Sequence, residues 1–514
     1  MINKLRFVLF ISLLAFGKLC LAQPDQATLT TLNQYYAKAI TDWNVPGMAV
    51  AIVSGDSVYL AKGYGVRDVK SGMAVDENSL FAVASNTKAF TAAALAILVD
   101  QKKIDWNDQV ISYLPWFELY DPYVSNQMTI RDLLTHRSGL KTFSGDLIWY
   151  GSNYTREQVI RKSKYLKPTY GFREQFGYSN IMYIAAGEII PAVTGFSYDE
   201  FLKNKLLFPL GMQHSVLSVN ELEGLNNVAQ PHTYVDGKPV VIPWLNWDNV
   251  GPAGALISCA SDMARWLQFQ LNNGITGLDT LISAKAMYEM HSAQTVLPVS
   301  KSSTTRFPST HLKAYGLGWT IMDYQGKKVI AHNGGYDGMI SQTVFIPEAN
   351  IGFVILTNAL SNMYYPLMYK TLDMLLNNPE QHDWSAEMLA FMKGNEEREK
   401  AAKAKIEASR VPNTRPSLKP DDYTGYYTCP IYDSVRVYTE KGQLMMQFER
   451  SPSFKAVLTH WHYDTFTVEF KDLPSLPKGF VTFTLNLDAK AAEMSIFLDN
   501  PDFDFTELEL KRLN

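Results

Sequence analysis

The chain has 514 residues, too many for one ordinary hydrophobic core, so its length predicts two domains joined by a linker. Hydrophobic residues make up 46% of the sequence and charged residues 19%, which is typical of a globular protein and unlike a disordered one. The formal net charge of -4 argues against the basic surface that nucleic-acid binding requires, so no nucleic-acid partner is expected.

Residues 1–22 have the pattern of a secretory signal peptide. A positively charged start precedes an apolar stretch at residues 7–16, and small residues stand before position 23. We expect cleavage after Ala22 and export, to the periplasm if the source is a Gram-negative bacterium. A lipid anchor at Cys20 is the alternative, but the two residues before it are larger than a lipidation signal prefers. No transmembrane span is expected after signal removal, because no other stretch is long and apolar enough.

The next part of the chain predicts one domain over residues 23–378. Two β-rich runs around a Gly-Asp turn at residues 47–68 predict a hairpin. A long section rich in helical segments follows, and strand patterns return at residues 327–335 and 340–359. This order predicts one sheet built from the two ends of the domain, with the helical section inserted between them.

The remainder predicts a linker and a second domain. Residues 379–420 are charged and helical with little apolar face, and they end in a proline-bearing tether. Residues 421–514 contain short alternating runs at regular intervals, which predict an all-β unit such as a small barrel. Cys259 and Cys429 fall in different domains, so we expect no disulfide between them. Cysteines and histidines are not clustered at zinc-site spacing, and we expect no metal and no cofactor.

The segment SNTK places a hydroxyl and an amine at the start of an apolar helix. Ser85 and Lys88 are three residues apart and therefore share one helical face. Ser85 stands where a helix N-cap would stand, and capping alone would explain it. Capping does not explain Lys88, because a lysine is rarely buried without a partner. A second Ser-x-x-Lys, at residues 475–478, has a proline before its lysine and cannot form this helical pair.

Two later segments carry further candidate side chains. Tyr178 and Asn180 lie in a glycine-flanked loop before an apolar helix, which suits a cleft, although a buried tyrosine followed by an asparagine cap would give the same pattern. Residues 332–335 read His-Asn-Gly-Gly after a strand pattern. The paired glycines would let a ligand or another backbone approach closely, and a plain glycine-rich hairpin is the alternative.

Together, SNTK, YSN and HNG occur in the order and with the intervals of the serine β-lactamase-like family, which the chain therefore resembles. The likeness is to the branch with Tyr-x-Asn, which holds class C β-lactamases, D-alanyl-D-alanine carboxypeptidases, D-aminopeptidases and esterases. Further similar segments are LLTHRSGL (133–140), PAGALISCASDMARW (252–266) and YGLGW (315–319). The resemblance implies an α/β (α+β) fold with an antiparallel sheet flanked by helices and an inserted helical subdomain. The C-terminal unit resembles a lipocalin-like barrel.

The resemblance also implies catalytic roles. Ser85 would attack the substrate as the nucleophile and form an acyl-enzyme. Lys88 would be the general base, with its pKa lowered by burial and nearby positive charge. Tyr178 would be the general acid and base, and its phenolate would be favoured by a charged Lys88. Whether the lysine or the tyrosine takes the first proton stays open.

The same resemblance implies substrate-binding roles. Asn180 would hold the substrate's amide carbonyl and help to orient the lysine. The backbone N–H of Gly335 would form the oxyanion hole with that of the nucleophilic serine. Asn333 and Gly334 belong to the same binding strand, and His332 would face a substrate carboxylate or polarise the tyrosine.

His332 stands where better-known members of the family have lysine. Because a histidine is mostly neutral at pH 7, strong recognition of a carboxylate is not expected. We therefore expect an exported serine hydrolase acting on small acyl substrates, such as D-amino-acid-containing peptides, amides or esters. The alternative is a penicillin-binding or β-lactamase-type protein that hydrolyses or senses β-lactams and cell-wall fragments. A Ser-His-Asp hydrolase ranks third, because Gly-x-Ser-x-Gly is absent. The expected partner is a small molecule or short peptide, and the oligomeric state stays open.

Overall fold

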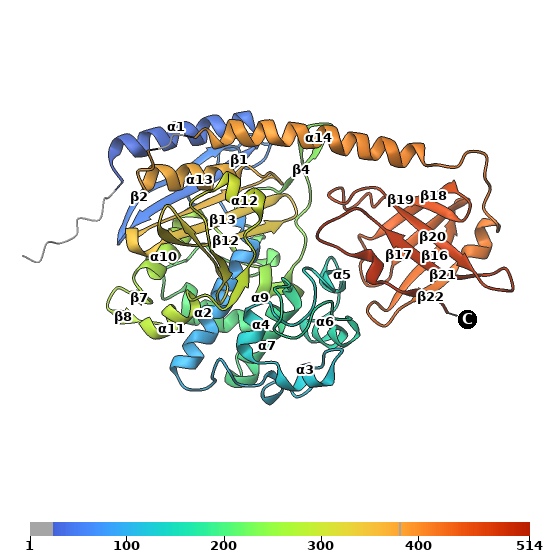
Figure 1. The fold of residues 1–514 in the computed structure, drawn as a ribbon, viewed down its shortest axis with the longest axis horizontal. Coiled ribbons are helices and arrows are strands. Elements are labelled where there is room, and N and C mark those ends of the chain that lie inside the picture. The colour runs from blue at the N-terminus through green and yellow to red at the C-terminus, as the bar shows by residue number, and fades with distance from the viewer. Residues whose placement is uncertain (1–23, 380–381, 514) are drawn as a thin grey trace, which may run out of the picture.

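The computed structural model describes residues 24–379 and 382–513. The predicted signal peptide, its cleavage site and Cys20 lie outside the described residues. An α/β domain and a β-barrel lie side by side, and one long helix runs from the first to the second (Figure 1). Within the described ranges, no single helix is long and apolar enough to cross a membrane, and one bent pair meets that test by length and composition alone.

The α/β domain is built on an eight-stranded antiparallel sheet with the order β2-β1-β14-β13-β12-β11-β10-β9. Its strands are β1 (Gly47–Ser54), β2 (Ser57–Gly65), β9 (Thr295–Leu297), β10 (Lys313–Tyr315), β11 (Thr320–Tyr324), β12 (Lys327–Tyr336), β13 (Met339–Ile346) and β14 (Ile351–Thr357). The hairpin β1–β2 pairs directly with β14, so Met48 lies opposite Thr357. The predicted hairpin and the predicted sheet built from both ends of the domain are therefore confirmed.

Helices cover both faces of this sheet. The helices of the domain are α1 (Gln26–Asp42), α2 (Thr87–Asp100), α3 (Pro122–Gln127), α4 (Ile130–Leu134), α5 (Asp146–Trp149), α6 (Arg156–Lys162), α7 (Asn180–Thr194), α8 (Tyr198–Leu202), α9 (Gly251–Gly254), α10 (Ala260–Leu271), α11 (Ala284–Met290), α12 (Lys301–Arg306) and α13 (Tyr364–Leu375). Alternate residues of β1 belong to two different cores, as strand geometry requires. Met48, Val50 and Ile52 pack in the core that holds α1 and α13, and the residues between them face the core of α2 and α10. The predicted fold class is confirmed.

Three short antiparallel pairs accompany the main sheet. They are β3 (Phe81–Ala82) with β6 (Ile257–Ser258), β4 (His232–Val235) with β5 (Lys238–Val241), and β7 (Ile275–Thr276) with β8 (Asp279–Thr280). The first pair matters for function, because β3 leads directly into the turn that carries Ser85.

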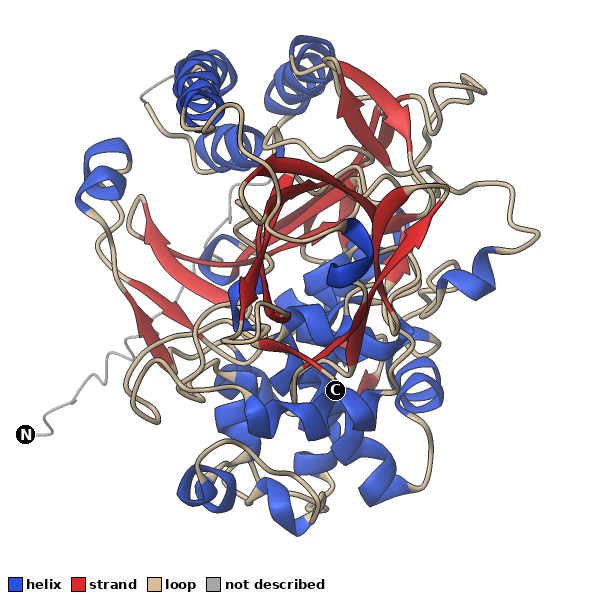
Figure 2. Ribbon diagram, turned by 90° about the vertical axis from the view of Figure 1, so that its right-hand side faces the viewer, coloured by secondary structure: helices blue, strands red, loops and turns tan. Residues whose placement is uncertain are grey.

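The C-terminal domain is a closed barrel in which each strand pairs with its neighbour in sequence and the last strand pairs with the first (Figure 2). Its strands are β15 (Gly425–Thr428), β16 (Ser434–Glu440), β17 (Gln443–Phe448), β18 (Lys455–His462), β19 (Thr465–Val468), β20 (Gly479–Leu485), β21 (Ala491–Phe497) and β22 (Leu510–Arg512). Its core is rich in packed aromatic rings, among them Tyr423, Phe466 and Phe483. Closure leaves no free sheet edge, and the predicted all-β barrel is confirmed.

The helix α14 (Trp384–Ala408) joins the two domains. Its first turn is anchored, because Trp384 and Ser385 are buried and the Ser385 hydroxyl accepts a hydrogen bond from Trp43 Nε1 at 2.8 Å. Most of its later side chains are exposed, as expected of a charged helix with little apolar face. Cys259 and Cys429 are both buried and unpaired, as expected.

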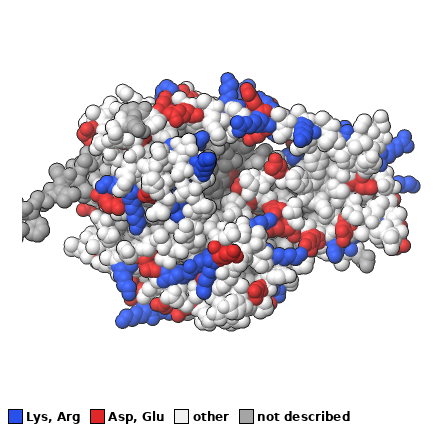
Figure 3. Space-filling model, viewed as in Figure 1, with Lys and Arg blue, Asp and Glu red and all other residues white. Residues whose placement is uncertain are grey.

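The barrel docks on the α/β domain through several polar contacts, which include ion pairs of Lys162 with Asp433 and of Lys167 with Glu509 as well as a cluster at residues 504–507. The Glu507 carboxylate accepts hydrogen bonds from Ser144 Oγ at 2.6 Å and from the Gly145 backbone N–H at 2.8 Å. Lys141 forms an ion pair with Asp504 beside this contact. On the face shown in Figure 3, positive and negative side chains are interspersed over both domains. Docking therefore uses specific polar contacts at the loop 141–145, next to the buried Asp146.

Candidate active site

The nucleophile candidate Ser85 lies on a tight turn that projects it out of the core. Residues Ala84–Asn86 form a single 3-10 turn before α2, and Ala84 has φ 47°, a conformation that is uncommon for a residue with a Cβ. Ser85 is partly exposed although the residues on either side of it are buried. Backbone strain of this kind occurs where the surrounding structure holds a functional side chain in place.

The alternative that Ser85 is only a helix cap is wrong. The N-cap position of α2 belongs to Asn86, and no side chain caps that helix. The hydroxyl of Ser85 instead lies 3.1 Å from Nζ of Lys88. Residues i and i+3 of the turn and helix therefore meet, as the spacing predicts.

Lys88 is completely buried, and its amine is surrounded by oxygen atoms. Nζ donates to Oδ1 of Asn180 at 2.7 Å and to the carbonyl of Ala253 at 2.9 Å. Burial lowers the pKa of Lys88 to about 7, and the charge of Asp146 partly opposes this shift. A neutral amine has two hydrogens and one lone pair, so donation to these two closest acceptors leaves the lone pair for the hydroxyl of Ser85.

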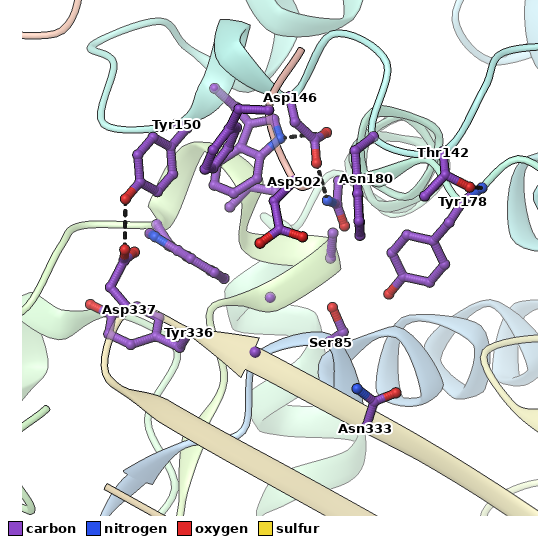
Figure 4. Close-up of a pocket in the computed structure, with 18 of the residues that line it drawn as sticks. Ser85, Thr142, Asp146, Tyr150, Tyr178, Asn180, Asn333, Tyr336, Asp337 and Asp502 are labelled. Carbon is purple, nitrogen blue, oxygen red and sulfur yellow. Dashed lines mark hydrogen bonds between the residues drawn. The ribbon is translucent and has the colours of Figure 1, made fainter. Parts of the chain in front are cut away.

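Tyr178 lies beside Ser85, with its hydroxyl directed toward that serine (Figure 4). Nζ of Lys88 lies 4.7 Å from the centre of the tyrosine ring. Burial raises the pKa of Tyr178 well above its usual value, and its hydrogen bond with Ser85 only partly offsets this effect. At neutral pH the tyrosine is therefore a neutral phenol that can donate a proton, and the predicted phenolate is not the favoured form in this environment.

Asn180 is the first residue of α7, and Ser179, not Asn180, is the N-cap of that helix. Besides accepting from Lys88, Asn180 donates through Nδ2 to Asp146 Oδ2 at 2.6 Å. The structure thus shows the predicted orienting role toward the lysine. Because Nδ2 carries a second hydrogen, the predicted contact with a substrate carbonyl remains chemically available.

Asp146 is a buried carboxylate that the sequence analysis missed. It accepts hydrogen bonds from Asn180 and from Trp149 Nε1, the latter at 2.8 Å. Burial raises its pKa to about 7, and these hydrogen bonds and the charge of Lys88 oppose that rise. Asp146 follows Gly145 and belongs to no motif, so nothing in the neighbouring sequence indicates its role. Through Asn180, Asp146 holds the amine of Lys88 in position. Its negative charge also favours the ammonium form of that lysine.

The strand β12 brings the HNG segment against the nucleophile. It pairs with β11 only as far as Ala331, so the following residues have no partner strand on that side. A Cβ on Gly334 would lie 2.2 Å from the carbonyl oxygen of Val83 and 2.9 Å from the backbone nitrogen of Ser85, a space that only glycine can occupy. Gly335 is exposed and lines the cleft beside Ser85. This arrangement supports the predicted oxyanion hole, since it places both backbone segments at the nucleophile.

His332 has a different partner from the one expected. Its Nε2 lies 2.8 Å from the hydroxyl of Tyr315, and its Nδ1 lies 2.6 Å from the carbonyl of Asn333. Burial lowers its pKa to about 3, so the ring is neutral, donates from Nδ1 and accepts from Tyr315. Both nitrogens are thus engaged, and neither is aimed at Tyr178. Asn333 is exposed at the cleft.

These groups open into a cleft of about 580 Å³ that both domains line. The α/β domain contributes Ser85, Tyr178, Asn180 and the β12 residues. The barrel contributes residues from two loops: Ser475, Leu476, Asn500, Asp502 and Phe503. No barrel residue is predicted at the site from the sequence.

Comparison with known proteins supports this architecture. Residues 32–372 match the family described as Beta-lactamase. The chain belongs to this family. Residues 409–512 match a second family, described as Domain of unknown function (DUF3471), which covers the barrel.

Several known proteins are similar to this member of the Beta-lactamase family. The Unguisins hydrolase ungD' of Aspergillus campestris (strain IBT 28561) is 29% identical over 455 residues, which are 82% of this chain and 80% of that protein. Protein flp of Staphylococcus aureus (strain MRSA252) is 29% identical over 353 residues, or 67% of this chain and 66% of flp. A solved octameric penicillin-binding protein homologue from Pyrococcus abyssi has a TM-score of 0.61 at 21% identity and covers 94% of this chain and 100% of its own, which shows a shared fold.

Other Beta-lactamase-like segments in the sequence contain the remaining supporting residues. LLTHRSGL holds His136, whose Nδ1 accepts from the Ser179 backbone N–H at 3.0 Å and so fixes the start of α7. PAGALISCASDMARW supplies the carbonyl of Ala253, and YGLGW supplies Tyr315. The similarity of these segments was visible in the sequence, but their roles depend on contacts between distant parts of the chain.

One group of side chains outside the cleft has donor types that suit a metal ion. Ligand atoms of His214, Cys259 and Asp262 lie within 4.8 Å of one another. However, Asp262 Oδ2 already accepts hydrogen bonds from the backbone N–H groups of His214 and Ser215 and from the Ser215 hydroxyl. Burial also raises the pKa of Cys259 to about 12, which disfavours the thiolate. These contacts serve a structural role, because they tie residues 214–215 to the first turn of α10.

Proposed function

We propose that this protein is an exported serine hydrolase that forms an acyl-enzyme on Ser85. The observation that carries the proposal is the 3.1 Å contact between the Ser85 hydroxyl and a buried amine whose pKa is lowered to about 7. A serine hydroxyl is a poor nucleophile until a base takes its proton, and this amine is the base within reach. Export is proposed from the signal-like N-terminal sequence alone.

The first half of the reaction would acylate the serine. Lys88 takes the proton from Ser85 Oγ as that oxygen forms a bond to the substrate's acyl carbon. The negative charge that develops on the carbonyl oxygen is stabilised by the backbone N–H groups of Ser85 and Gly335. When the bond to the leaving group breaks, the phenol of Tyr178 donates a proton to it, and the proton on Lys88 restores the tyrosine.

The second half would release the acyl group. Water enters from the cleft, loses a proton to the base network of Lys88 and Tyr178, and attacks the ester carbon. Ser85 leaves as the alkoxide and is reprotonated from the same network, which returns every group to its starting state. The low pKa of the lysine and the raised pKa of the tyrosine favour Lys88 as the first acceptor.

For the substrate, we propose small acyl compounds such as D-amino-acid-containing peptides, amides or esters. Three observations support this choice over a β-lactam. His332 is neutral and engaged with Tyr315, and none of the described residues that line the cleft is a lysine or arginine, so a substrate carboxylate would find no cationic side chain there. The similar ungD' is named as a hydrolase of unguisins.

A substrate panel tests the proposal. We expect the protein to hydrolyse p-nitrophenyl acetate and D-alanine p-nitroanilide faster than L-alanine p-nitroanilide or a chromogenic cephalosporin. Ser85→Ala should abolish turnover and covalent labelling by a fluorophosphonate probe. Ser302→Ala is the matched control, because Ser302 is an exposed serine that does not line the cleft, and it should leave labelling intact. Turnover that persists in Ser85→Ala would refute the mechanism, and faster cephalosporin hydrolysis would refute the substrate class.

A further inference from the structure

The end of the cleft opposite Tyr178 is built jointly by the two domains. In Figure 4, Asp337 and Asp502 lie to one side of Ser85, and Tyr178 lies to the other. Asp337 follows the end of β12, whereas Asp502 comes from the barrel loop between β21 and β22. Since Tyr178 would protonate the leaving group, the acyl portion of a substrate would extend toward the two carboxylates.

One carboxylate oxygen of Asp337 accepts no hydrogen bond from the described residues. Its Oδ1 accepts hydrogen bonds from the Tyr150 hydroxyl at 2.6 Å and from Ser475 Oγ at 3.3 Å. Its Oδ2 is buried and has no hydrogen-bond partner among the described residues. A carboxylate oxygen that is buried without a partner is costly, so Oδ2 is able to accept a hydrogen bond from a donor that enters the cleft.

Asp502 adds a second negative charge that faces the same space. Its side chain is exposed in the cleft, and its charge raises the pKa of Asp337 further above the usual value, in addition to the larger effect of burial. Asp146 also lines the cleft, but Lys88 lies close enough to offset its charge. No lysine or arginine is among the described lining residues, so Asp337 and Asp502 have no compensating cation there.

Aromatic rings complete this end of the cleft. Trp247 lies with its ring centroid 4.6 Å from that of Tyr336, and Tyr150 lies 4.2 Å from Phe503 by the same measure. All four rings line the cleft. Carboxylates combined with aromatic faces favour an organic cation, whose charge is attracted to both and whose carbon atoms pack on the rings.

We propose that Asp337 and Asp502, with the surrounding rings, bind a cationic nitrogen carried by the acyl portion of the substrate. The group would be a protonated amine or a guanidinium. This inference rests on the proposed function, because it takes Ser85 as the point of attack. It makes the barrel a specificity-determining part of the hydrolase, since Asp502 and Phe503 belong to it.

Competitive inhibition of p-nitrophenyl acetate hydrolysis by paired amides tests the site. One pair is D-alaninamide and N-acetyl-D-alaninamide, which differ in an α-ammonium group. The other is N-acetyl-D-lysinamide and N-acetyl-D-norleucinamide, which differ in a remote ammonium group. In at least one pair, the cationic member should bind roughly tenfold or more tightly, as expected for hydrogen bonds to a charged group. The pair that shows the preference tells whether the cation is the α-amine or a side chain.

Single substitutions assign the preference to these carboxylates. Asp502→Asn should reduce the preference for the cationic member to about threefold or less, and Asp337→Asn should reduce it as well. Asp499→Asn is the matched control, because Asp499 is an exposed carboxylate on the same loop that does not line the cleft, and it should keep the full preference. The inference would be overturned if the parent protein showed no preference for the cationic inhibitor, or if Asp502→Asn kept that preference. Loss of the preference to the same extent in Asp499→Asn would also overturn it.

The outcomes separate this inference from the proposed function. If ester hydrolysis requires Ser85 but neither pair shows a preference, the hydrolase stands and the cation site falls. If ester hydrolysis does not require Ser85, the proposed function fails and this inference fails with it.

Discussion

The two sides of the cleft are held in different ways. Ser85, Lys88 and Asn180 sit at the starts of buried helices, where each polar atom has a defined partner. On the other side, Asp502 is an exposed carboxylate on a barrel loop. The difference suggests a division of roles. The α/β domain holds Ser85, Lys88 and Asn180 in place, whereas the barrel loops line the cleft and can change in sequence without disturbing those three residues.

The largest effect should come from removing the buried amine. Lys88→Met keeps the length and apolar character of the side chain, and we expect kcat/KM for p-nitrophenyl acetate to fall roughly 10²–10⁴-fold, because the general base is lost. Circular dichroism should show an unchanged fold, since a neutral side chain suits this buried position. Activity within about threefold of the parent would show that another group activates the serine.

The close approach of β12 gives the next largest effect. In Gly334→Ala, the new Cβ would collide with the Val83 carbonyl and the Ser85 nitrogen, so the strand must shift away from the nucleophile. A displacement of this kind should lower kcat about 100-fold. Gly394→Ala is the control, because a Cβ on this residue of α14 would meet no atom within 4 Å and the residue does not line the cleft. If the two variants were equally stable to heat and also equally active, this role for Gly334 would be contradicted.

Asp146 should affect both the rate and its pH dependence. Lys88 must be uncharged to act, so kcat/KM should rise with pH through about 7. The negative charge of Asp146 favours the ammonium form, so Asp146→Asn should lower the pKa of the lysine and move the rising limb to lower pH. The plateau of kcat/KM should fall roughly tenfold, because an asparagine has a single side-chain oxygen and cannot accept from both Asn180 and Trp149. If the plateau of kcat/KM fell while the pH of its rising limb stayed the same, the role of Asp146 would be purely structural.

The docking contact should have the smallest effect. Glu507→Gln weakens the hydrogen bonds to Ser144 and Gly145, so we expect a decrease in Tm of about 2–4 °C and a loss in kcat of no more than a few fold. Glu509→Gln is the matched control, because Glu509 also pairs across the two domains, with Lys167, but this pair is exposed and exposed pairs contribute little. Identical Tm changes in the two variants would show that the contact at Glu507 does not hold the domains together.

Much of the fold was predictable because its signals are local. Hairpin turns, strand alternation and the proline-bearing linker are encoded within short segments, and the predicted sheet and barrel are confirmed. The meeting of Ser85 and Lys88, which lie 3.1 Å apart, was also predictable, because residues three apart at the start of a helix share one face.

The rest of the site could not be predicted, because it depends on contacts between distant segments. Asp146 has no motif, and its role appears only when α5 meets the start of α7. His332 was expected to face a substrate carboxylate or to polarise Tyr178, but the fold pairs it with Tyr315 from β10, the second strand along the sheet from β12. Asp502 lies more than 400 residues after the nucleophile in a barrel whose docking position no sequence pattern encodes.

The most direct test of the account is the mass of the protein after rapid quenching during turnover of p-nitrophenyl acetate. We expect a transient increase equal to one acetyl group, located by peptide mapping on the peptide that contains Ser85 and absent in Ser85→Ala. An acetyl group on a different residue that is kinetically competent for turnover, or turnover without any acyl-protein, would contradict the central claim that the Ser85–Lys88 pair performs the chemistry.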